Sequence, residues 1–493
     1  MPAATLIPSS SFHTSAVQQN VVKKKSVSIQ GARAPKLRES RSARIKKKSR
    51  ERPRPPPVGE RKAQRKRIVL SNTNALEVQG LQKLGVDNMA DVAQVGKVLA
   101  LDGPLLDQLR DAKAFKTTQN WNMFRTPSTL IRNETVEVGS DIQRVNDSVN
   151  GEGEPATVHK LITGEKASGK SIHLLQAMSM AYLNKWLVIN VPDCQEYILN
   201  QSAYAPVPQT DSTSSQMYIQ PQLASDLLAR LAHSNASVLS SLRPIHNHSA
   251  TLPKSANKLK SLKDLALLGA NEHHIAPQVW DAVWKELTVK PENAKEGSAR
   301  PPVLIAIDGV NFWMDFTRYK SSDYKPIHAH QFTLIKQFLD LLFPATKTQT
   351  ALPHGGVVMA ATTKSNHPTT PTFEHITTQI VQRQANPDSP YTPDLSYTDP
   401  YMTKVDSRVW ELRNRSEHTD LVDLKGLSRP ESKGLLEYFA KSGIFKEAVT
   451  DGAVSEKWSL SGGGIVGELC KLSGRLRTGI FETGRREGVK MRA

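Results

Sequence analysis

The apolar residues of this sequence form short continuous runs that are separated by stretches of helical periodicity. Four of these runs have the length and apolar content of strands buried on both faces, and they cover residues 158–162, 186–191, 303–307 and 357–362. Ile172 to Leu183 follows the first run with the spacing of a helix. Strands that alternate with helices in this way predict an α/β fold with a parallel sheet.

The pattern also predicts elements on either side of this region. Residues 76–84 and 105–115 have helical spacing, and residues 129–138 have the composition of a short strand. Near the C-terminus, Ser428 stands three residues before Glu431 and ahead of apolar positions, which predicts a capping box and a helix. We expect this helical region to form a lid over the sheet. Surface insertions rich in Ser, Thr, Pro, Asn and His are expected at 202–222, 234–260 and 364–402.

The first predicted strand leads into a glycine-rich loop that is suited to bind phosphate. The loop reads Gly164, Glu165, Lys166, Ala167, Ser168, Gly169, Lys170 and Ser171, which is the G-x-x-x-x-G-K-[ST] pattern between a strand and a helix. The glycines allow a tight turn in which backbone N–H groups and the helix N-terminus face a phosphate. Lys170 would bring a positive charge to the β and γ oxygens, and the Ser171 hydroxyl would ligate Mg²⁺. We therefore interpret the loop as a nucleotide site rather than an incidental glycine turn.

Two polar residues end predicted strands and are expected beside this loop. Asp308 ends the run that begins at Val303, and ligands bind at the carboxyl ends of parallel strands, so Asp308 is a candidate Mg²⁺ partner together with Ser171. The alternative for Asp308 is a capping role in the turn before Gly309. Thr362 ends the last run and is a candidate γ-phosphate sensor, with a simple bond to the backbone as its alternative role.

The three residues that follow the strand-end acid, Gly309 to Asn311, include no general base. Many P-loop ATPases place a glutamate there to activate the attacking water. A positioned base contributes about 10² to 10⁴ to the rate of a reaction. We therefore expect a site that holds nucleotide rather than one that hydrolyses it quickly. The side chains that could change this interpretation are Asn311, Asp315 and Glu165.

The positive charge of the chain is concentrated at its N-terminus. The formal net charge of the 493 residues is +18, and residues 1–70 contribute +16 of it through 19 Lys and Arg against three acids. This segment has few large apolar side chains, so we expect a disordered tail. Binding to a polyanion such as nucleic acid is its most direct interpretation, because each neutralised phosphate releases a counterion. A nuclear localisation signal and a solvated tail are the alternatives. The C-terminus is basic again from Lys471 to Arg492.

Composition limits the remaining classes. At about 100 to 200 residues per domain, the length predicts two to four domains. No apolar run approaches the roughly 18 residues of a membrane-spanning helix. The two cysteines, Cys194 and Cys470, provide neither a disulfide framework nor zinc-site spacing. The acid-poor, Ser-rich start is typical of a mitochondrial transit peptide, but no Lys or Arg precedes Lys23.

Several segments together suggest a family. They are residues 114–116, 119–127, 164–171, 186–192, 303–311 and 427–439. In these segments the chain resembles the mitochondrial small-ribosomal-subunit GTP-binding proteins, also called the death-associated protein three family, in a fungal form. The segment around Trp121, which runs from Gln119 to Pro127, is the most family-specific of them, since P-loops occur in many unrelated proteins.

The resemblance implies a P-loop NTPase fold related to AAA+ and STAND ATPases, and a bound guanine nucleotide, GTP or GDP, with Mg²⁺. It implies that Lys170 and Ser171 contact phosphate and Mg²⁺ and that Asp308 is the strand-end acid. It further implies a place in the head of the small mitochondrial ribosomal subunit. The partners would be its rRNA and other mitochondrial ribosomal proteins, with bridge contacts to the large subunit. The residues themselves do not decide between GTP and ATP, and the role of the long basic tail in RNA binding rests on its charge.

We predict a structural, nucleotide-binding protein of the mitochondrial ribosome in the matrix. Its expected parts are a basic tail with a candidate transit peptide (1–70), an N-terminal extension (71–145), a P-loop domain with surface insertions (146–420), and a helical lid with a basic C-terminus (421–493). The alternative function is an active AAA+-type ATPase that acts on DNA in the nucleus or mitochondrion. A third hypothesis is a scaffold whose P-loop stays empty.

Overall fold

Five parallel strands form the central sheet, in the order β11-β3-β10-β7-β4. They are β3 (Thr157–Gly164), β4 (Leu187–Val191), β7 (Val303–Asp308), β10 (Gly356–Ala361) and β11 (Asp420–Leu424). The computed structural model describes residues 68–151, 155–208, 215–246, 248, 252, 259–289, 300–344, 352–365, 370–386 and 405–473. Residues 1–67 of the predicted basic tail and all but the first residues of the basic C-terminus lie outside these described residues.

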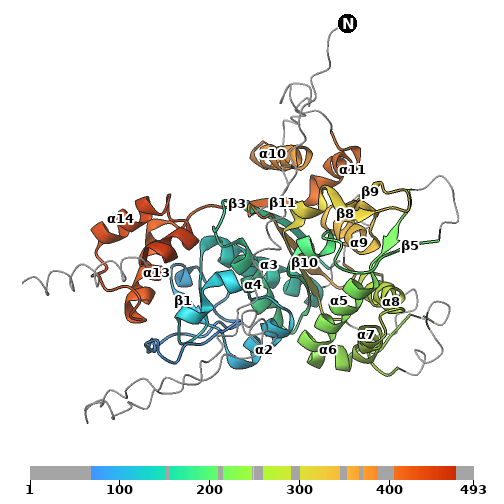
Figure 1. Ribbon diagram of the computed structural model, residues 1–493. Helices are drawn as coiled ribbons and strands as arrows, with labels where there is room; N and C mark the ends of the chain where they lie inside the picture. The colour runs from blue at the N-terminus through green and yellow to red at the C-terminus, as the bar shows by residue number, and fades with distance from the viewer. Residues whose placement is uncertain are drawn as a thin grey trace, which may run out of the picture. The chain divides into compact units, whose positions relative to one another are not determined.

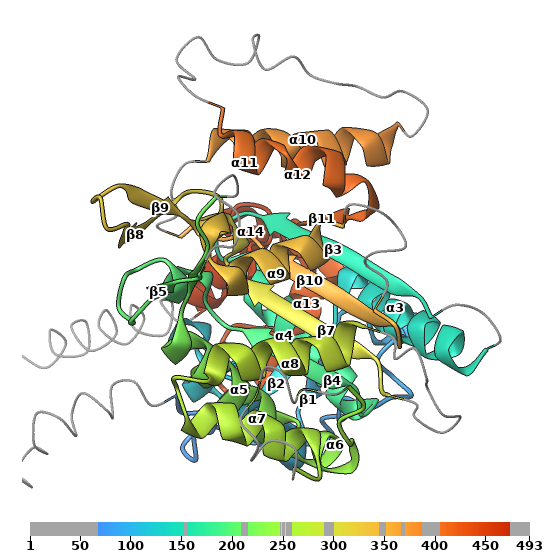
Figure 2. The ribbon, with the colours of Figure 1, turned by 90° about the vertical axis from the view of Figure 1, so that its right-hand side faces the viewer.

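The register of the sheet brings the predicted site residues to one edge. β10 lies between β3 and β7, and Ala361 is level with Ile162 on one side and with Asp308 on the other. Figure 2 shows these three strands side by side. The glycine-rich loop and Asp308 therefore lie at the same edge of the sheet, separated by one strand, and this is the edge at which parallel sheets bind ligands.

Alternate residues of each strand face two different cores. In β7, Leu304 and Ala306 pack with α2 (Gly103–Asp111), α3 (Asn133–Asn150) and α4 (Lys170–Leu183). Ile305 and Ile307 pack on the opposite face with a second set of helices. That set includes α5 (Pro221–Ser234), α6 (Ala236–Ser241), α7 (Leu262–Asn271), α8 (Ala276–Thr288), α9 (Thr333–Leu342), α10 (Pro371–Ala385), α11 (Ser407–Trp410) and α12 (Leu412–Arg415). Helices cover both faces of the sheet, so every residue of β4, β7 and β10 is buried. All of these residues are apolar except Asn190 and Asp308.

The N-terminal segment packs on the C-terminal helices. β1 (Val98–Ala100) and β2 (Ser128–Leu130) form an antiparallel pair that lies beside α13 (Arg429–Lys441), with α14 (Asp451–Leu460) next to it (Figure 1). Phe124 stacks on Phe439 with ring centroids 5.6 Å apart. A Cβ atom on Gly434 would lie 1.7 Å from the carbonyl oxygen of Gly96, so α13 touches this segment backbone to backbone. These contacts form a third apolar cluster.

Short elements complete the described fold. Two small hairpins are formed by β5 (Ala205–Pro206) with β6 (Tyr218–Ile219) and by β8 (Phe316–Lys320) with β9 (Pro326–His328). The 3-10 turns are η3 (Val92–Gln94), η4 (Thr117–Gln119), η5 (Trp121–Met123), η6 (Cys194–Tyr197), η8 (Val310–Trp313), η9 (Ala329–Gln331) and η11 (Ser416–His418). Across the part of the chain that the structure describes, every helix is too short or too polar to traverse a bilayer.

The predicted α/β class, the four predicted strands and the capping box of α13 are confirmed. In α13, the Ser428 hydroxyl accepts from the Glu431 N–H at 3.4 Å, and Glu431 accepts from the Ser428 N–H at 2.8 Å. The expected insertion at 364–402 includes α10, and the other two include parts of α5, α6 and the β5–β6 hairpin, while some residues of all three lie outside the described ranges.

Three local predictions were wrong in whole or in part. Residues 76–84 are not helical; Gly80 has a left-handed φ of 71°, and Lys83 forms a bridge with Ala100 instead. The helix expected at 105–115 ends at Asp111, and the strand expected at 129–138 stops at Leu130, where α3 soon begins. Helix α3 is amphipathic, and burial of its apolar side overrides the β-branched composition.

Candidate phosphate-binding site

The turn between β3 and α4 has the tight geometry that its glycine spacing predicts. Gly164, Ala167 and Gly169 have positive φ values of 137°, 64° and 103°. Glycine adopts such values at no steric cost, whereas Ala167 is a side-chain-bearing residue in the left-handed region. Residues in this region persist where the surrounding structure holds them, and they cluster at ligand-binding turns.

Several N–H groups of this turn have no backbone acceptor among the described residues. Within the described ranges, no backbone–backbone hydrogen bond is donated by Lys166, Ala167, Gly169, Lys170 or Ser171. Lys170 and Ser171 also begin α4, where N–H groups have no partner inside the helix. The Ser168 hydroxyl is buried without a hydrogen-bond partner in the same described part. A nest of free amides at a helix N-terminus is the arrangement that binds phosphate, so these residues fit a phosphate group.

Lys170 folds back into the turn. Its Nζ donates to the carbonyl oxygens of Gly164 at 2.8 Å and Glu165 at 2.7 Å. Burial, reinforced by the charge of Lys364, lowers the pKa of Lys170 to about 8, while nearby acids including Asp308 raise it. An anion in the turn would stabilise the charged ammonium, so this side chain favours a phosphate over a neutral ligand.

Asp308 ends β7 as predicted, and its carboxylate is engaged by a residue from a distant part of the chain. The residue is 6% exposed and forms an ion pair with Lys116. The capping role considered for Asp308 does not match these contacts, because the Gly309 N–H donates to the carbonyl oxygen of Ala361 at 2.8 Å. Asp308 is therefore a buried, paired carboxylate at the ligand-binding edge of the sheet.

Ser171 and Asp308 form the only oxygen pair predicted for Mg²⁺, and their chemistry fits that ion. Ser171 is half-buried at the second position of α4, and Asp308 lies at the same edge of the sheet. No group of three His, Cys, Asp or Glu that could hold a metal occurs among the described residues. Mg²⁺ bound with nucleotide uses one or two protein ligands, with phosphate oxygens and water completing the shell. The pair would thus hold the ion only together with a phosphate ligand.

The side chains of Thr362, the candidate sensor, and of Asn311 both bond to the protein backbone. The Thr362 hydroxyl donates to the carbonyl oxygen of Ile162 at 3.3 Å, which is the role expected as the alternative to sensing phosphate. Asn311 exchanges two hydrogen bonds of 2.9 Å with the backbone of Thr363. These contacts join the ends of β7, β10 and β3. Both the oxygen and the nitrogen of the Asn311 amide are thus engaged in fixing that edge.

The other two side chains that could have supplied catalysis are also bonded within the protein. Glu165 and Lys364 form an exposed ion pair of 2.6 Å across the turn, and the hydrogen bond and charge of Lys364 lower the pKa of Glu165. Asp315 accepts from the N–H of Phe316 at 2.6 Å. Neither contact prepares a carboxylate to take a proton from water.

Sequence reasoning missed two residues that hold the turn from outside. The Arg132 side chain, from just before α3, donates to the carbonyl oxygens of Ser168 at 3.1 Å and Lys425 at 2.9 Å. Gly467 donates its N–H to the carbonyl oxygen of Ala167 at 3.0 Å, and a Cβ there would lie 2.6 Å from the Ala167 Cβ. Residues 466–473 are helical, so a helix start from the C-terminal region rests on the turn. The glycine-rich stretch 462–464 was the signal that could have revealed this close approach.

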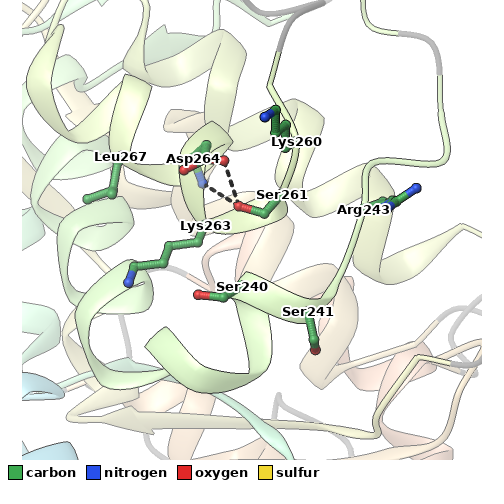
Figure 3. A pocket seen from close by; sticks show the side chains of 8 residues that line it. All are labelled: Ser240, Ser241, Arg243, Lys260, Ser261, Lys263, Asp264 and Leu267. Atoms are coloured by element: carbon green, nitrogen blue, oxygen red, sulfur yellow. Dashed lines mark hydrogen bonds between the residues drawn. The ribbon is translucent and has the colours of Figure 1, made fainter.

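Two cavities lie away from the turn. One, of ≈ 590 Å³, adjoins Lys116 and is lined mainly by Arg110, Lys113, Phe115, Lys116, Asp193 and Glu196. The other, of ≈ 570 Å³, lies between α6 and α7 and is shown in Figure 3. Its basic lining residues are Arg243, Lys260 and Lys263, and its acid, Asp264, accepts from the Ser261 hydroxyl at 2.8 Å. This second cavity therefore has an excess of positive charge.

The sheet and the turn define an α/β protein with a five-stranded parallel sheet flanked by helices, an architecture compatible with a P-loop-like fold. A sequence profile of the family described as mitochondrial ribosomal death-associated protein 3 matches residues 129–472. The chain belongs to this family, as the resemblance in its motifs predicted. The match begins after the segment around Trp121.

Individual relatives agree with this assignment. The chain is 39% identical over 420 residues to the small ribosomal subunit protein mS29 of Neurospora crassa, which covers 85% of this chain and 83% of that protein. It is 25% identical over 178 residues to mS29 of Mus musculus, covering 36% of this chain and 43% of the mouse protein. The corresponding protein of Bos taurus is 26% identical over 183 residues. The fungal relative is thus matched over most of its length, and the mammalian ones over less than half.

Proposed function

We propose that this protein is a structural component of the small subunit of the mitochondrial ribosome and holds a guanine nucleotide with Mg²⁺. The name of the fungal relative, matched over most of both chains, supports the ribosomal part, and the description of the family supports a mitochondrial location, which we propose to be the matrix. The free amides of the turn support the nucleotide part, and they are the observation that carries it. We further propose that the fold is a P-loop NTPase fold of the AAA+ and STAND kind.

The proposed site uses residues from three parts of the chain. Gly164 to Ser171 would surround the β-phosphate with N–H groups, with the Lys170 ammonium neutralising its charge. Ser171 and Asp308 would hold Mg²⁺, which would screen the negative charge of the phosphates. Thr362 lies at the same edge but bonds to Ile162. Since Glu165, Asp315 and Asn311 are bonded within the protein, we infer that nucleotide would serve mainly to stabilise the fold, by about 4 kcal/mol at a thousandfold excess over Kd.

The remaining parts of the chain receive roles from their position and charge. α13, α14 and helical residues 466–473 would act as the lid (421–493), because Gly467 touches the phosphate turn. The N-terminal extension (71–145) would hold the lid against the P-loop domain (146–420), although β11 (Asp420–Leu424), at the boundary with the lid, pairs with β3. The tail (1–70), with its candidate transit peptide, would contact rRNA through its charge. Other ribosomal proteins, including some of the large subunit, would be further partners.

The proposal is tested by releasing and identifying bound nucleotide. Mitochondrial ribosomes purified without added nucleotide are denatured, and the released small molecules are measured by mass spectrometry. We expect about one guanine nucleotide per copy of this chain beyond that of ribosomes that lack it. Lys170→Ala is expected to lose the nucleotide and to lower thermal stability, whereas Lys336→Ala, at an exposed position of α9, serves as the control.

Other outcomes would favour the other functions. Steady turnover of ATP at several cycles per minute, with the protein in the nucleus or on mitochondrial DNA, would support the active AAA+-type ATPase. A Lys170→Ala protein with unchanged thermal stability and assembly would support a scaffold with an empty P-loop. Recovery of an adenine nucleotide would show that the site binds adenine rather than guanine, and the proposed structural role would stand.

A further inference from the structure

Lys116 forms an ion pair with Asp308, the carboxylate that would ligate the proposed Mg²⁺. The Asp308 side chain is 8% exposed, while the Lys116 side chain is 34% exposed. A carboxylate can accept at both of its oxygens, but a lysine ammonium and a divalent cation that share it repel each other strongly at contact distance. Full pairing with Lys116 and close coordination of Mg²⁺ are therefore competing arrangements of Asp308.

The backbone of Lys116 is held firmly, so the competition concerns its side chain. The Gln119 side-chain oxygen accepts from the Lys116 N–H at 2.8 Å and from the Trp121 indole N–H at 2.7 Å. Trp121 is buried and meets Phe115 edge to face, with ring centroids 5.1 Å apart. The residues around Trp121 thus hold the Lys116 backbone in a bonded turn from which its side chain reaches the strand-end acid.

The cavity beside Lys116 offers its ammonium other acidic partners. The cavity of ≈ 590 Å³ beside Lys116 is lined by two other acids, Asp193 and Glu196. Burial raises the pKa of Asp193, and the charge of Lys116 opposes this effect, so the two groups already interact. A lysine has four rotatable side-chain bonds, and its ammonium can move between acids without movement of the backbone.

We propose that Lys116 competes with the divalent cation for Asp308 and moves toward Asp193 and Glu196 when metal and nucleotide bind. This inference rests on the proposed nucleotide site. It makes Lys116 a positioning residue that sets how much Mg²⁺ the site requires. It also gives the Trp121 segment a role beyond packing, because that segment fixes the competitor in place.

The test uses the full chain with a fluorescent GDP analogue as the probe, titrated with MgCl₂. We expect Lys116→Met to lower the Mg²⁺ concentration needed for half-maximal retention of the probe by about tenfold, the equivalent of one charged hydrogen bond. The matched control is Lys113→Met, which removes the same charge from an exposed residue on the same cavity. An equal midpoint for the two variants, or a higher one for Lys116→Met, would overturn the proposal.

A second measurement separates competition from a purely structural role. Without metal or nucleotide, Lys116→Met leaves Asp308 buried and unpaired, so its thermal midpoint should fall below that of the wild type. Addition of Mg²⁺ and GDP should then raise the midpoint of the variant by more than that of the wild type. An equal rise in both would mean that Lys116 only packs, which contradicts competition. If no protein binds the probe at any Mg²⁺ concentration, the proposed function fails first and this inference fails with it.

Discussion

Arg132 donates a hydrogen bond from its guanidinium to the carbonyl oxygen of Ser168 at 3.1 Å. The same side chain reaches the carbonyl oxygen of Lys425 and pairs with Glu134. It is 6% exposed, so one buried cation joins the N-terminal segment, the phosphate turn and the strand that leads to the C-terminal helices. Local structure at three distant places in the sequence depends on it.

Replacement of Arg132 by Met should therefore cost more than a surface charge would. We expect the free energy of unfolding to fall by about 2 to 4 kcal/mol, because the buried carbonyl of Ser168 and the part-buried carbonyl of Lys425 lose their charged donor. Urea unfolding of the full chain measures this loss. Arg110→Met removes an exposed pair with Asp107 and should change stability by less than about 0.5 kcal/mol. Equal losses for the two variants would argue against the role of Arg132.

Gly434→Ala should destabilise the protein even though alanine is the better helix former. The new Cβ would lie 1.7 Å from the carbonyl oxygen of Gly96, so α13 must move away from the N-terminal segment. We expect a loss of about 1 to 3 kcal/mol in thermal or urea unfolding. In Gly452→Ala the nearest atom to the new Cβ is 3.9 Å away, and a gain of about 0.4 to 1 kcal/mol is expected. Stabilisation of both variants would show that the close approach of Gly434 to Gly96 contributes nothing to stability.

Stability should fall as the pH is lowered, partly because of His173. Burial, together with the charges of Arg132 and Lys160, lowers the pKa of His173 from 6.5 to about 3. Between these pH values the unfolded chain binds a proton that the folded protein does not, so stability is lost as pH falls below 6.5. The contribution is about 1.4 kcal/mol per pH unit within that window. His173→Leu should reduce the pH slope by this amount.

The measurement is the free energy of unfolding at pH values from about 7.5 down to 4.5, across the upper part of this window. His233→Leu, on an exposed position of α5, is the control and should keep the slope of the wild type. A slope that is the same in all three proteins would show that His173 takes no part. His159 and His330 have pKa values lowered to about 4 and about 3 for the same reason, burial, so a residual slope is expected in His173→Leu.

Deletion of residues 23–67 should weaken binding to RNA and flatten its dependence on salt. All of the basic residues of the predicted tail lie in this range. Each phosphate contact that is lost reduces the slope of log K against log salt by about 0.7 to 0.9. A salt titration with a labelled fragment of mitochondrial small-subunit rRNA measures the slope. Deletion of residues 1–22, which include no Lys or Arg, should leave it unchanged. Identical slopes for both deletions would exclude the tail as an RNA anchor.

The parts of the fold that could be predicted are those that the local sequence determines. β7 is a continuous apolar run because helices cover both of its faces, and the turn from Gly164 to Ser171 is specified by residues within one strand–turn–helix unit. β11 was missed because it is an edge strand of two Asp, two Leu and one Val, which gives no long apolar run. Its position follows from pairing with β3 rather than from its own composition.

The parts of the site that could not be predicted come from distant segments. Lys116 meets Asp308 across 192 residues, and Arg132 meets Lys425 across 293. Neither Lys116 nor Arg132 stands in an unusual local sequence. Their contacts with distant residues therefore become visible only in the folded chain. Asn311 was recognised as important, but its amide is used to join two strand ends instead of acting on a ligand.

The hydroxyl groups of Ser128 and Tyr438 lie 2.5 Å apart although 310 residues separate them. At about 5 to 20 residues per second, translation of that interval lasts about 15 to 60 s. Throughout this time Phe124 and its neighbours lack the helix that covers them, and the phosphate turn lacks Gly467. The newly made chain therefore completes its folding only after its last helices emerge, and until then its apolar N-terminal segment needs protection from aggregation.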